Sequence, residues 1–311
     1  MTALEESILR TTIALAVFGA PPTISELIQH LDSGAQTQSV QSPISEEFFS
    51  LLLQATQVLC DQGKLVIRRG RYLPSSLAAE LLPLLQGEEW LPRKMRKAKR
   101  VARWLARLDG VRSVFLCNRT ALGLPHDDGD LDFLVVVRHG SIWQTRGLAG
   151  LPFVLLGDRP KPGQRERDVV CLSFFLSDQA LDLQTCALQP DDVYLRHWFL
   201  GLLPLVDDGV GTALWGANKS LRQRHEHARI WIPSPDLSVP LPSARIPVSH
   251  SLERLARHLQ SKYFPRRLRE VANLDTRVMI SDSHLKFHID DGRERLRDRY
   301  LELCATYGIA G

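Results

Sequence analysis

The chain has 311 residues, and its 39 lysines and arginines against 35 aspartates and glutamates give a formal net charge of +4. Hydrophobic residues make up 44% and charged residues 24%, an ordinary globular composition that excludes a disordered, collagen-like or coiled-coil chain. At about 100–200 residues per domain, this length predicts two or three domains, each able to bury a core. The net charge is too small to identify a nucleic-acid-binding protein, so the distribution of charges along the chain is more informative.

The sequence has no features of a membrane or disulfide-bonded protein. No stretch approaches the ~18 uninterrupted apolar residues of a membrane helix, and the acidic start Met1–Glu6 lacks the features of a signal peptide. The five cysteines are scattered without a CxxC pair, which argues against a disulfide framework and a zinc ribbon. We therefore expect a cytoplasmic protein with no membrane partner.

The first 80 residues predict three helices followed by a β-hairpin. Residues 4–19 are apolar at helical spacing, and Thr23 with Glu26 forms a capping box that starts a second helix. Ser45 begins a third helix, and two short strands follow around a turn at Arg69-Gly70. This pattern is typical of a winged helix. A small helical domain whose hairpin serves only for packing is the alternative.

A basic amphipathic helix is predicted over residues 91–108, which hold eight cations and no acid. Without them the rest of the chain has 31 basic residues against 35 acidic ones, so the positive charge is concentrated in this helix. Such a helix can bind phosphates, contact an acidic partner or present a solvated face. The candidate contacts with nucleic acid or another polyanion are Lys94, Lys97, Arg100 and Arg103.

Three predicted strands follow, over residues 111–117, 131–137 and 169–176, with a helix near 141–156 between the last two. This order implies a mixed or largely parallel α/β sheet. Asp130 and Asp132 stand at the start of the second strand, where positions two apart face the same side. Adjacent carboxylates repel each other unless a cation lies between them, and hard oxygen ligands of this kind suit Mg²⁺.

A strand, a turn, roughly ten residues and Asp-x-Asp at the start of a second strand resemble the polymerase-β-like nucleotidyltransferases. The layout also resembles bacterial nucleotidyltransferase-domain proteins with a winged-helix-like segment, a basic helix, a transferase core and a helical C-terminal part. The resemblance implies that Asp130 and Asp132 bind Mg²⁺ (or Mn²⁺) and that a third carboxylate comes from a neighbouring strand. Asp168 is the nearest candidate for it, and a strand-edge residue in a charged loop is the alternative.

One departure from the family pattern affects the nucleotide site. The family has Gly-Ser at the end of the first strand, whereas this chain has Asn118-Arg119. Asparagine tolerates left-handed backbone geometry, so the turn can survive, and the Arg119 guanidinium can meet phosphate oxygens. Arg119 could equally fill the pocket and exclude the nucleotide.

We therefore expect an α/β (α+β) protein with an N-terminal winged-helix-like domain, a central nucleotidyltransferase-type mixed sheet with flanking helices, and a helical C-terminal part. The expected regions are 1–80 (winged-helix-like), 81–109 (basic connecting helix), 110–186 (nucleotidyltransferase-like core), 187–230 (helical), 231–248 (proline-rich connector) and 249–311 (C-terminal helical region).

Two functions compete. The first is Mg²⁺-dependent transfer of a nucleoside monophosphate from a nucleoside triphosphate to an acceptor that is a small molecule, a protein or an RNA. The second is a catalytically degenerate protein that regulates by binding nucleic acid or protein through its winged helix and basic helix. A further pattern, His225-Glu226-His227, is expected to be a surface helix because no third metal ligand is near it in sequence.

Overall fold

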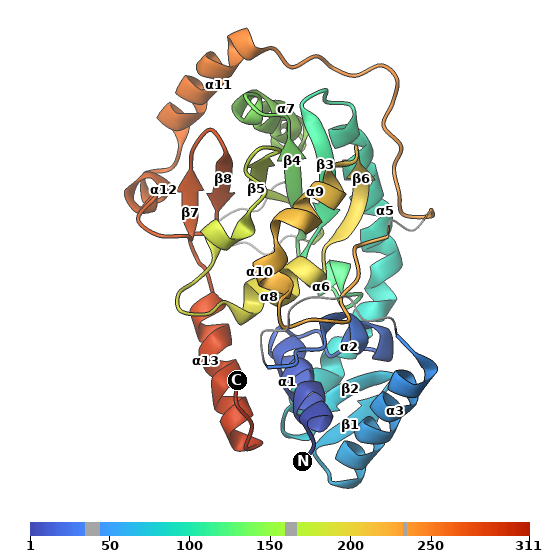
Figure 1. The fold of residues 1–311 in the computed structure, drawn as a ribbon. Helices are drawn as coiled ribbons and strands as arrows, with labels where there is room; N and C mark the ends of the chain where they lie inside the picture. Colours follow the sequence, from blue (N-terminus) through green and yellow to red (C-terminus); the bar gives the residue numbers. More distant parts are fainter. Residues whose placement is uncertain (35–43, 159–166, 233–234) are drawn as a thin grey trace.

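The computed structural model describes residues 1–34, 44–158, 167–232 and 235–311, and it is a mixed α/β protein built on one large sheet (Figure 1). Helices flank this six-stranded sheet, and a smaller helical unit with a two-stranded hairpin lies at one end. The predicted mixed α/β class is confirmed. Within the described residues, no helix is both long enough and apolar enough to cross a membrane.

The N-terminal unit consists of three helices and a hairpin, in the predicted order. The predicted capping box is present, since the Thr23 hydroxyl accepts from the Glu26 N–H and the Glu26 carboxylate accepts from the Thr23 N–H. Arg69 and Gly70 have φ values of 49° and 71°, the left-handed pair that a tight hairpin turn requires. The elements are α1 (Ala3–Val17), α2 (Ile24–His30), α3 (Glu46–Asp61), β1 (Leu65–Arg68) and β2 (Arg71–Pro74).

The last helix, α13 (Arg293–Thr306), packs against α1 and completes the core of the N-terminal unit. Its buried residues Tyr300, Leu303 and Cys304 belong to the same apolar cluster as residues of α1, α2 and α3. The core of the predicted 1–80 domain therefore also needs side chains from the end of the chain.

The large sheet has the strand order β6-β3-β4-β5-β8-β7. The β4–β5 pair is parallel and the other neighbouring pairs are antiparallel, so the sheet is mixed. The helix α7 connects the two parallel strands, as the sequence predicts. The elements are β3 (Val111–Leu116), β4 (Leu131–Val137), α7 (Ile142–Leu155), β5 (Val170–Ser177), β6 (Leu203–Asp207), β7 (Val278–Ile280) and β8 (His284–Phe287).

Three of these strands were not predicted. We expected residues 187–230 and 249–311 to be helical, and this expectation is wrong for β6, β7 and β8. Each has three to five residues, too few for a period-2 pattern to stand out from neighbouring helices. They are stabilised as strands by pairing: β6 with β3, β8 with β5, and β7 with β8.

Alternating side chains of the central strands build two apolar cores, one on each face of the sheet. Phe133 and Val135 face the core that includes α7 and the long helix α5 (Gly87–Ala106). Leu134 and Val136 face the core that includes α8 (Val193–Leu200) and α9 (Val210–Ala217). Asp132 has the parity of Leu134 and Val136, which directs it toward the α8 face.

The predicted basic helix is α5, and it starts four residues earlier than expected, at Gly87. Its apolar stripe packs on the sheet through Ala98, Val101, Ala102 and Leu105. Figure 1 shows α5 running from the N-terminal unit along the side of the sheet. The helix therefore links the two units and places its residues beside the start of β4.

The remaining elements are short or peripheral. Outside residues 233–234, which are not described, the predicted connector 231–248 contains no helix or strand beyond a bridge between Leu108 and Ile246. The other elements are η1 (Ser75–Leu77), α4 (Ala78–Leu81), η2 (Leu82–Gln86), α6 (Asn118–Ala121), η3 (Leu183–Cys186), α10 (Lys219–Arg222), α11 (His250–Tyr263) and α12 (Arg266–Val271).

Candidate functional site

The two predicted metal-binding carboxylates meet at the beginning of β4. Asp130 immediately precedes this strand, and Asp132 is its second residue. In the parallel pairing with β5, Asp132 lies opposite Cys171. One ligand atom from each of Asp130, Asp132 and Cys171 lies within 4.8 Å of the other two. The parallel strand pair therefore brings two carboxylates and a thiol to one point.

Burial and mutual repulsion disfavour the charged forms of the two aspartates. Burial and the negative charge of Asp130 raise the pKa of Asp132 to about 6. Burial also raises the pKa of Asp130 above its usual value. A bound cation would favour both carboxylate forms, so the pair has the electrostatic character of a cation site.

Asn118 holds Asp132 in place. It lies just after β3 with φ of 58°, the left-handed conformation that asparagine tolerates. Its Nδ2 donates to Asp132 Oδ2 at 2.6 Å, and its Oδ1 accepts from the Tyr194 hydroxyl at 2.7 Å. Both polar groups of the Asn118 side chain are thus hydrogen-bonded to other side chains of the protein. Tyr194, which sequence reasoning missed, belongs to α8 and has no motif around it.

Arg119 is a largely buried cation next in sequence to Asn118. Its Nη1 contacts His126, whereas Nε and Nη2 are buried and have no hydrogen-bond partner among the described residues. Burial lowers the pKa of Arg119 to about 10, so the guanidinium remains charged at neutral pH. A buried guanidinium with two unpartnered nitrogens is costly unless an anion meets it.

These residues line a cleft of about 300 Å³ between the N-terminal unit and α8. Asp130 and Asp132 lie on one side of it, and the end of α1 and residues of α8 form another. This volume is at the lower end of the range for small-molecule sites. The residues lining the cleft are Val17, Phe18, Asn118, Arg119, Thr120, Leu122, Pro125, His126, Gly129, Asp130, Asp132, Tyr194, His197, Trp198, Gly201 and Leu296.

Asp168, the candidate third carboxylate, forms ion pairs with residues of α5, whereas Asp130 and Asp132 group with Cys171. It precedes β5 in a left-handed conformation, and its carboxylate bonds Arg93 Nε at 2.8 Å and Lys94 Nζ at 2.7 Å. Burial opposes ionisation of Asp168, but the hydrogen bonds and charges of Arg93 and Lys94 outweigh it and hold its pKa below the usual value. The position across from Asp132 on the neighbouring strand is occupied by Cys171 instead.

The four predicted polyanion contacts on α5 have different environments. Lys94 is fully buried, and its Nζ also donates to the Gly129 carbonyl at 2.5 Å, so its assignment as a surface contact is wrong. The physical reason is its position four residues before Ala98, on the apolar stripe. Lys97 pairs with Asp158 at 2.7 Å. Arg100 and Arg103 are exposed, as expected.

A second cavity, of about 490 Å³, adjoins Cys171 and Ser173 on β5. Its wall includes the rings of Phe264 and Phe287, and the Arg146 guanidinium lies 4.5 Å from the centre of the Phe287 ring. Cys171, which lines this cavity, is also the residue that groups with the two aspartates. Leu172, Phe264 and Leu268 of its wall belong to the core on the α5 and α7 face of the sheet, whereas Asp132 is directed toward the α8 face.

Comparison with known proteins found no matching family, no matching curated protein and no matching solved structure. The functional argument therefore rests on the side chains themselves.

Proposed function

We propose that the protein is a divalent-metal-dependent nucleotidyltransferase of the polymerase-β-like type with a winged-helix-like N-terminal unit. It would move a nucleoside monophosphate from a nucleoside triphosphate to an acceptor. The observation that carries the proposal is the convergence of Asp130 and Asp132 at the cleft, with raised pKa values. The mixed sheet, with both residues at the start of an inner strand, supports it.

The donor set fits a hard cation such as Mg²⁺ or Mn²⁺. Mg²⁺ is usually bound through one or two carboxylates, with water and substrate phosphates as the other ligands. Burial and the charges of Asp132 and Asp130 raise the pKa of the Cys171 thiol well above its usual value, so this residue offers no competing thiolate. When bound, the metal ion would neutralise charge on the transferring phosphate.

Arg119 and Asn118 take different parts in this proposal. Arg119 lines the cleft, and a turn of its side chain would bring the buried, unpartnered Nε and Nη2 to two phosphate oxygens, in the role of the serine hydroxyl of the family pattern. Asn118 positions Asp132 through the 2.6 Å hydrogen bond, and Tyr194 fixes the Asn118 amide from the other side. Asn118 therefore acts on the triphosphate through Asp132.

The reaction is an in-line displacement at the α-phosphorus. The acceptor oxygen or nitrogen forms a bond to that phosphorus, the bond to the β-phosphate bridging oxygen breaks, and pyrophosphate leaves. The proton of the acceptor passes to a carboxylate oxygen of Asp130, the more exposed member of the pair.

A purely regulatory role through nucleic-acid binding has less support. Two of the four predicted phosphate contacts, Lys94 and Lys97, are paired with carboxylates. The third helix, α3, carries three acids and no lysine or arginine, which is unfavourable for a helix that enters a DNA groove. The positive charge that remains exposed on α5 includes Arg100 and Arg103.

The proposal is tested by incubating the full chain with each α-labelled nucleoside triphosphate, Mg²⁺ and a pooled metabolite, RNA and protein extract. We expect Mg²⁺-dependent release of pyrophosphate and label in one acceptor class, because the cleft is lined by both the carboxylate pair and the Arg119 cation. Arg119→Ala is expected to raise the KM for the nucleotide by about 10-fold or more, since it removes a charge-assisted contact.

The same variant decides whether Arg119 binds phosphate or obstructs the cleft. If Arg119→Ala instead tightened nucleotide binding, the residue would be an obstruction and the proposed role would be wrong. Absence of binding and turnover with all four nucleotides, or activity that persists in an Asp130→Ala/Asp132→Ala double variant, would remove the basis of the transferase proposal.

A further inference from the structure

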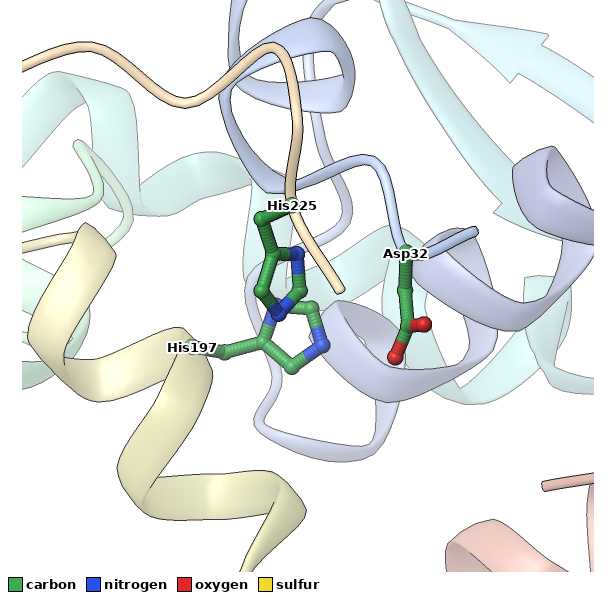
Figure 2. A group of neighbouring side chains, drawn as sticks. All are labelled: Asp32, His197 and His225. Atoms are coloured by element: carbon green, nitrogen blue, oxygen red, sulfur yellow. The ribbon is translucent and has the colours of Figure 1, made fainter. Parts of the chain in front are cut away.

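A second group of titratable side chains is buried behind the cleft, formed by Asp32, His197 and His225 (Figure 2). The sequence favoured a surface helix for His225 and its neighbours, and this expectation is wrong. Helix α10 ends at Arg222, and His225 is 2% exposed. Two further ligand-type residues, distant in sequence, lie beside it.

The three residues come from three separate segments of the fold. Asp32 follows α2, His197 lies in α8, and His225 follows α10. One ligand atom from each lies within 4.8 Å of the other two. Figure 2 shows both imidazole rings and the carboxylate gathered at one place between these segments. Tertiary packing alone creates this arrangement.

Each of the three side chains leaves one buried polar atom without a hydrogen-bond partner among the described residues. These atoms are Nε2 of His197, Nε2 of His225 and Oδ2 of Asp32. The Arg196 Nη2 lies 3.7 Å from Asp32 Oδ2, beyond hydrogen-bond distance. An unsatisfied polar atom in a protein interior costs about 1–3 kcal/mol, so three of them in one cluster call for an occupant.

The other polar atoms of the three residues are held by the protein. His225 Nδ1 is 3.0 Å from the His30 carbonyl oxygen, and His197 Nδ1 is 3.1 Å from His30 Nδ1. Asp32 Oδ1 accepts from Arg224 Nε at 2.8 Å. A histidine that donates from Nδ1 presents a lone pair at Nε2, which is the usual second-sphere arrangement of a metal-binding imidazole.

We propose that Asp32 Oδ2, His197 Nε2 and His225 Nε2 bind one divalent transition-metal ion, with Zn²⁺ as the preferred ion. Two imidazoles and a carboxylate are borderline ligands that suit zinc and are unsuited to Mg²⁺ or Ca²⁺. Three protein ligands leave one tetrahedral position for water. The positive charge of the nearby Arg196 disfavours a bound cation, but its Nη1 forms an ion pair with Asp191 on the other side.

The protonation states of the cluster support metal binding. Burial lowers the pKa of His225 to about 4 and that of His197 well below its usual value, so both rings are neutral at pH 7. Asp32 keeps a lowered pKa although burial opposes its charge, because His225, Arg224 and Arg196 favour the carboxylate. Neutral imidazoles and an ionised carboxylate are the forms that bind metal.

The proposed ion would connect the N-terminal unit to α8. His197 is three residues after Tyr194 and also lines the cleft. A metal at this position would fix the wall of the cleft without belonging to the Asp130 and Asp132 pair. The inference is therefore independent of the proposed transferase activity.

The test uses the full chain after chelator treatment. Zn²⁺ is added in competition with a chromogenic chelator, bound metal is quantified by plasma mass spectrometry, and Tm is measured with and without Zn²⁺. We expect one Zn²⁺ per chain and a Tm higher by about 5 °C with Zn²⁺, because the ion binds only the folded state. His225→Gln should bind Zn²⁺ at least about 100-fold more weakly.

His258→Gln is the matched control, because His258 is an exposed histidine on α11; it should bind Zn²⁺ as the unmodified chain does. Asp32→Asn provides a second, nearly isosteric variant in case His225→Gln does not fold. If the unmodified chain takes up no Zn²⁺ and its Tm does not move, the cluster holds water and the proposal is wrong. Equal Zn²⁺ affinity of His225→Gln and the unmodified chain would also overturn it.

Discussion

Replacing Asp132 with asparagine is expected to lower the rate of nucleotidyl transfer by about 10³-fold, which corresponds to about 4 kcal/mol of lost transition-state stabilisation. Asp132 lines the cleft, lies beside Asp130 and is held by Asn118, so it is the best fixed of the candidate ligands. Steady-state kinetics at saturating Mg²⁺ and nucleotide, with the acceptor identified from the screen, would measure the effect.

Asp128→Asn is the matched control for this variant. Asp128 is an exposed acid two residues before Asp130 and does not line the cleft. Its replacement should change kcat by less than about threefold, because an exposed acid outside the cleft is not a ligand of the cation. A similar loss in both variants would mean that the general negative charge of the loop matters, and it would contradict a specific ligand role for Asp132.

The stability of the Asp132→Asn variant should move in the opposite direction from its activity. A raised pKa means that the carboxylate form is less favourable in the folded chain than in the unfolded chain. The folded state therefore loses stability as pH rises through about 6. Removing the charge is expected to raise Tm at pH 7.5 in the absence of divalent cations, the trade-off typical of a site selected for function.

Replacing Lys94 with methionine is expected to lower the free energy of unfolding by about 3 kcal/mol. Lys94 is 0% exposed and bonds both Asp168 and the Gly129 carbonyl. Its removal leaves the Asp168 carboxylate with Arg93 as its remaining ion-pair partner on α5 and leaves Gly129, next to Asp130, without its donor. Urea unfolding at pH 7 measures this loss.

Lys97→Met is the matched control on the same helix. Its ion pair with Asp158 is about a quarter exposed on each side, so its loss should cost less than about 1 kcal/mol. If Lys94→Met were no more destabilising than Lys97→Met, Lys94 would not be a buried partner of Asp168. A steep loss of nucleic-acid affinity in Lys94→Met with unchanged stability would instead restore its assignment as a phosphate contact.

The Asp168 pair also has a pH signature with a defined sign. The pKa of Asp168 is held below its usual value in the folded chain. The ion pair therefore stabilises the folded state at pH values above the pKa of an aspartate in the unfolded chain, which is about 3.9. This contribution is lost as pH falls through the lower folded value. The stability difference between Lys94→Met and the unmodified chain should therefore shrink at strongly acid pH.

Local patterns in the sequence predicted the features that depend on neighbouring residues. The Thr23–Glu26 capping box, the Arg69-Gly70 turn and the left-handed Asn118 each follow from side-chain chemistry within a few positions. β4, which contains Asp132, and the neighbouring β5 carry long apolar runs, so both could be predicted as strands from the sequence.

Features that depend on distant partners could not be predicted in this way. Strand β8 pairs with β5 across about a hundred residues, and its four residues have no pattern of their own. Lys94 is a cation that only a buried carboxylate from another segment makes tolerable. Asp32 and His197 join His225 only when α2, α8 and the segment after α10 pack together.

The central claim is that Asp130 and Asp132 form a divalent-cation site that a nucleotide completes. Mn²⁺ binding followed by electron paramagnetic resonance, with and without a non-hydrolysable nucleoside triphosphate, tests it most directly. We predict that the unmodified chain binds Mn²⁺, that the nucleotide tightens this binding about 10-fold or more because phosphate oxygens complete the ligand set, and that an Asp130→Asn/Asp132→Asn variant loses both effects. Mn²⁺ binding that is unchanged in the double variant, or no binding to the unmodified chain with nucleotide present, would contradict the claim.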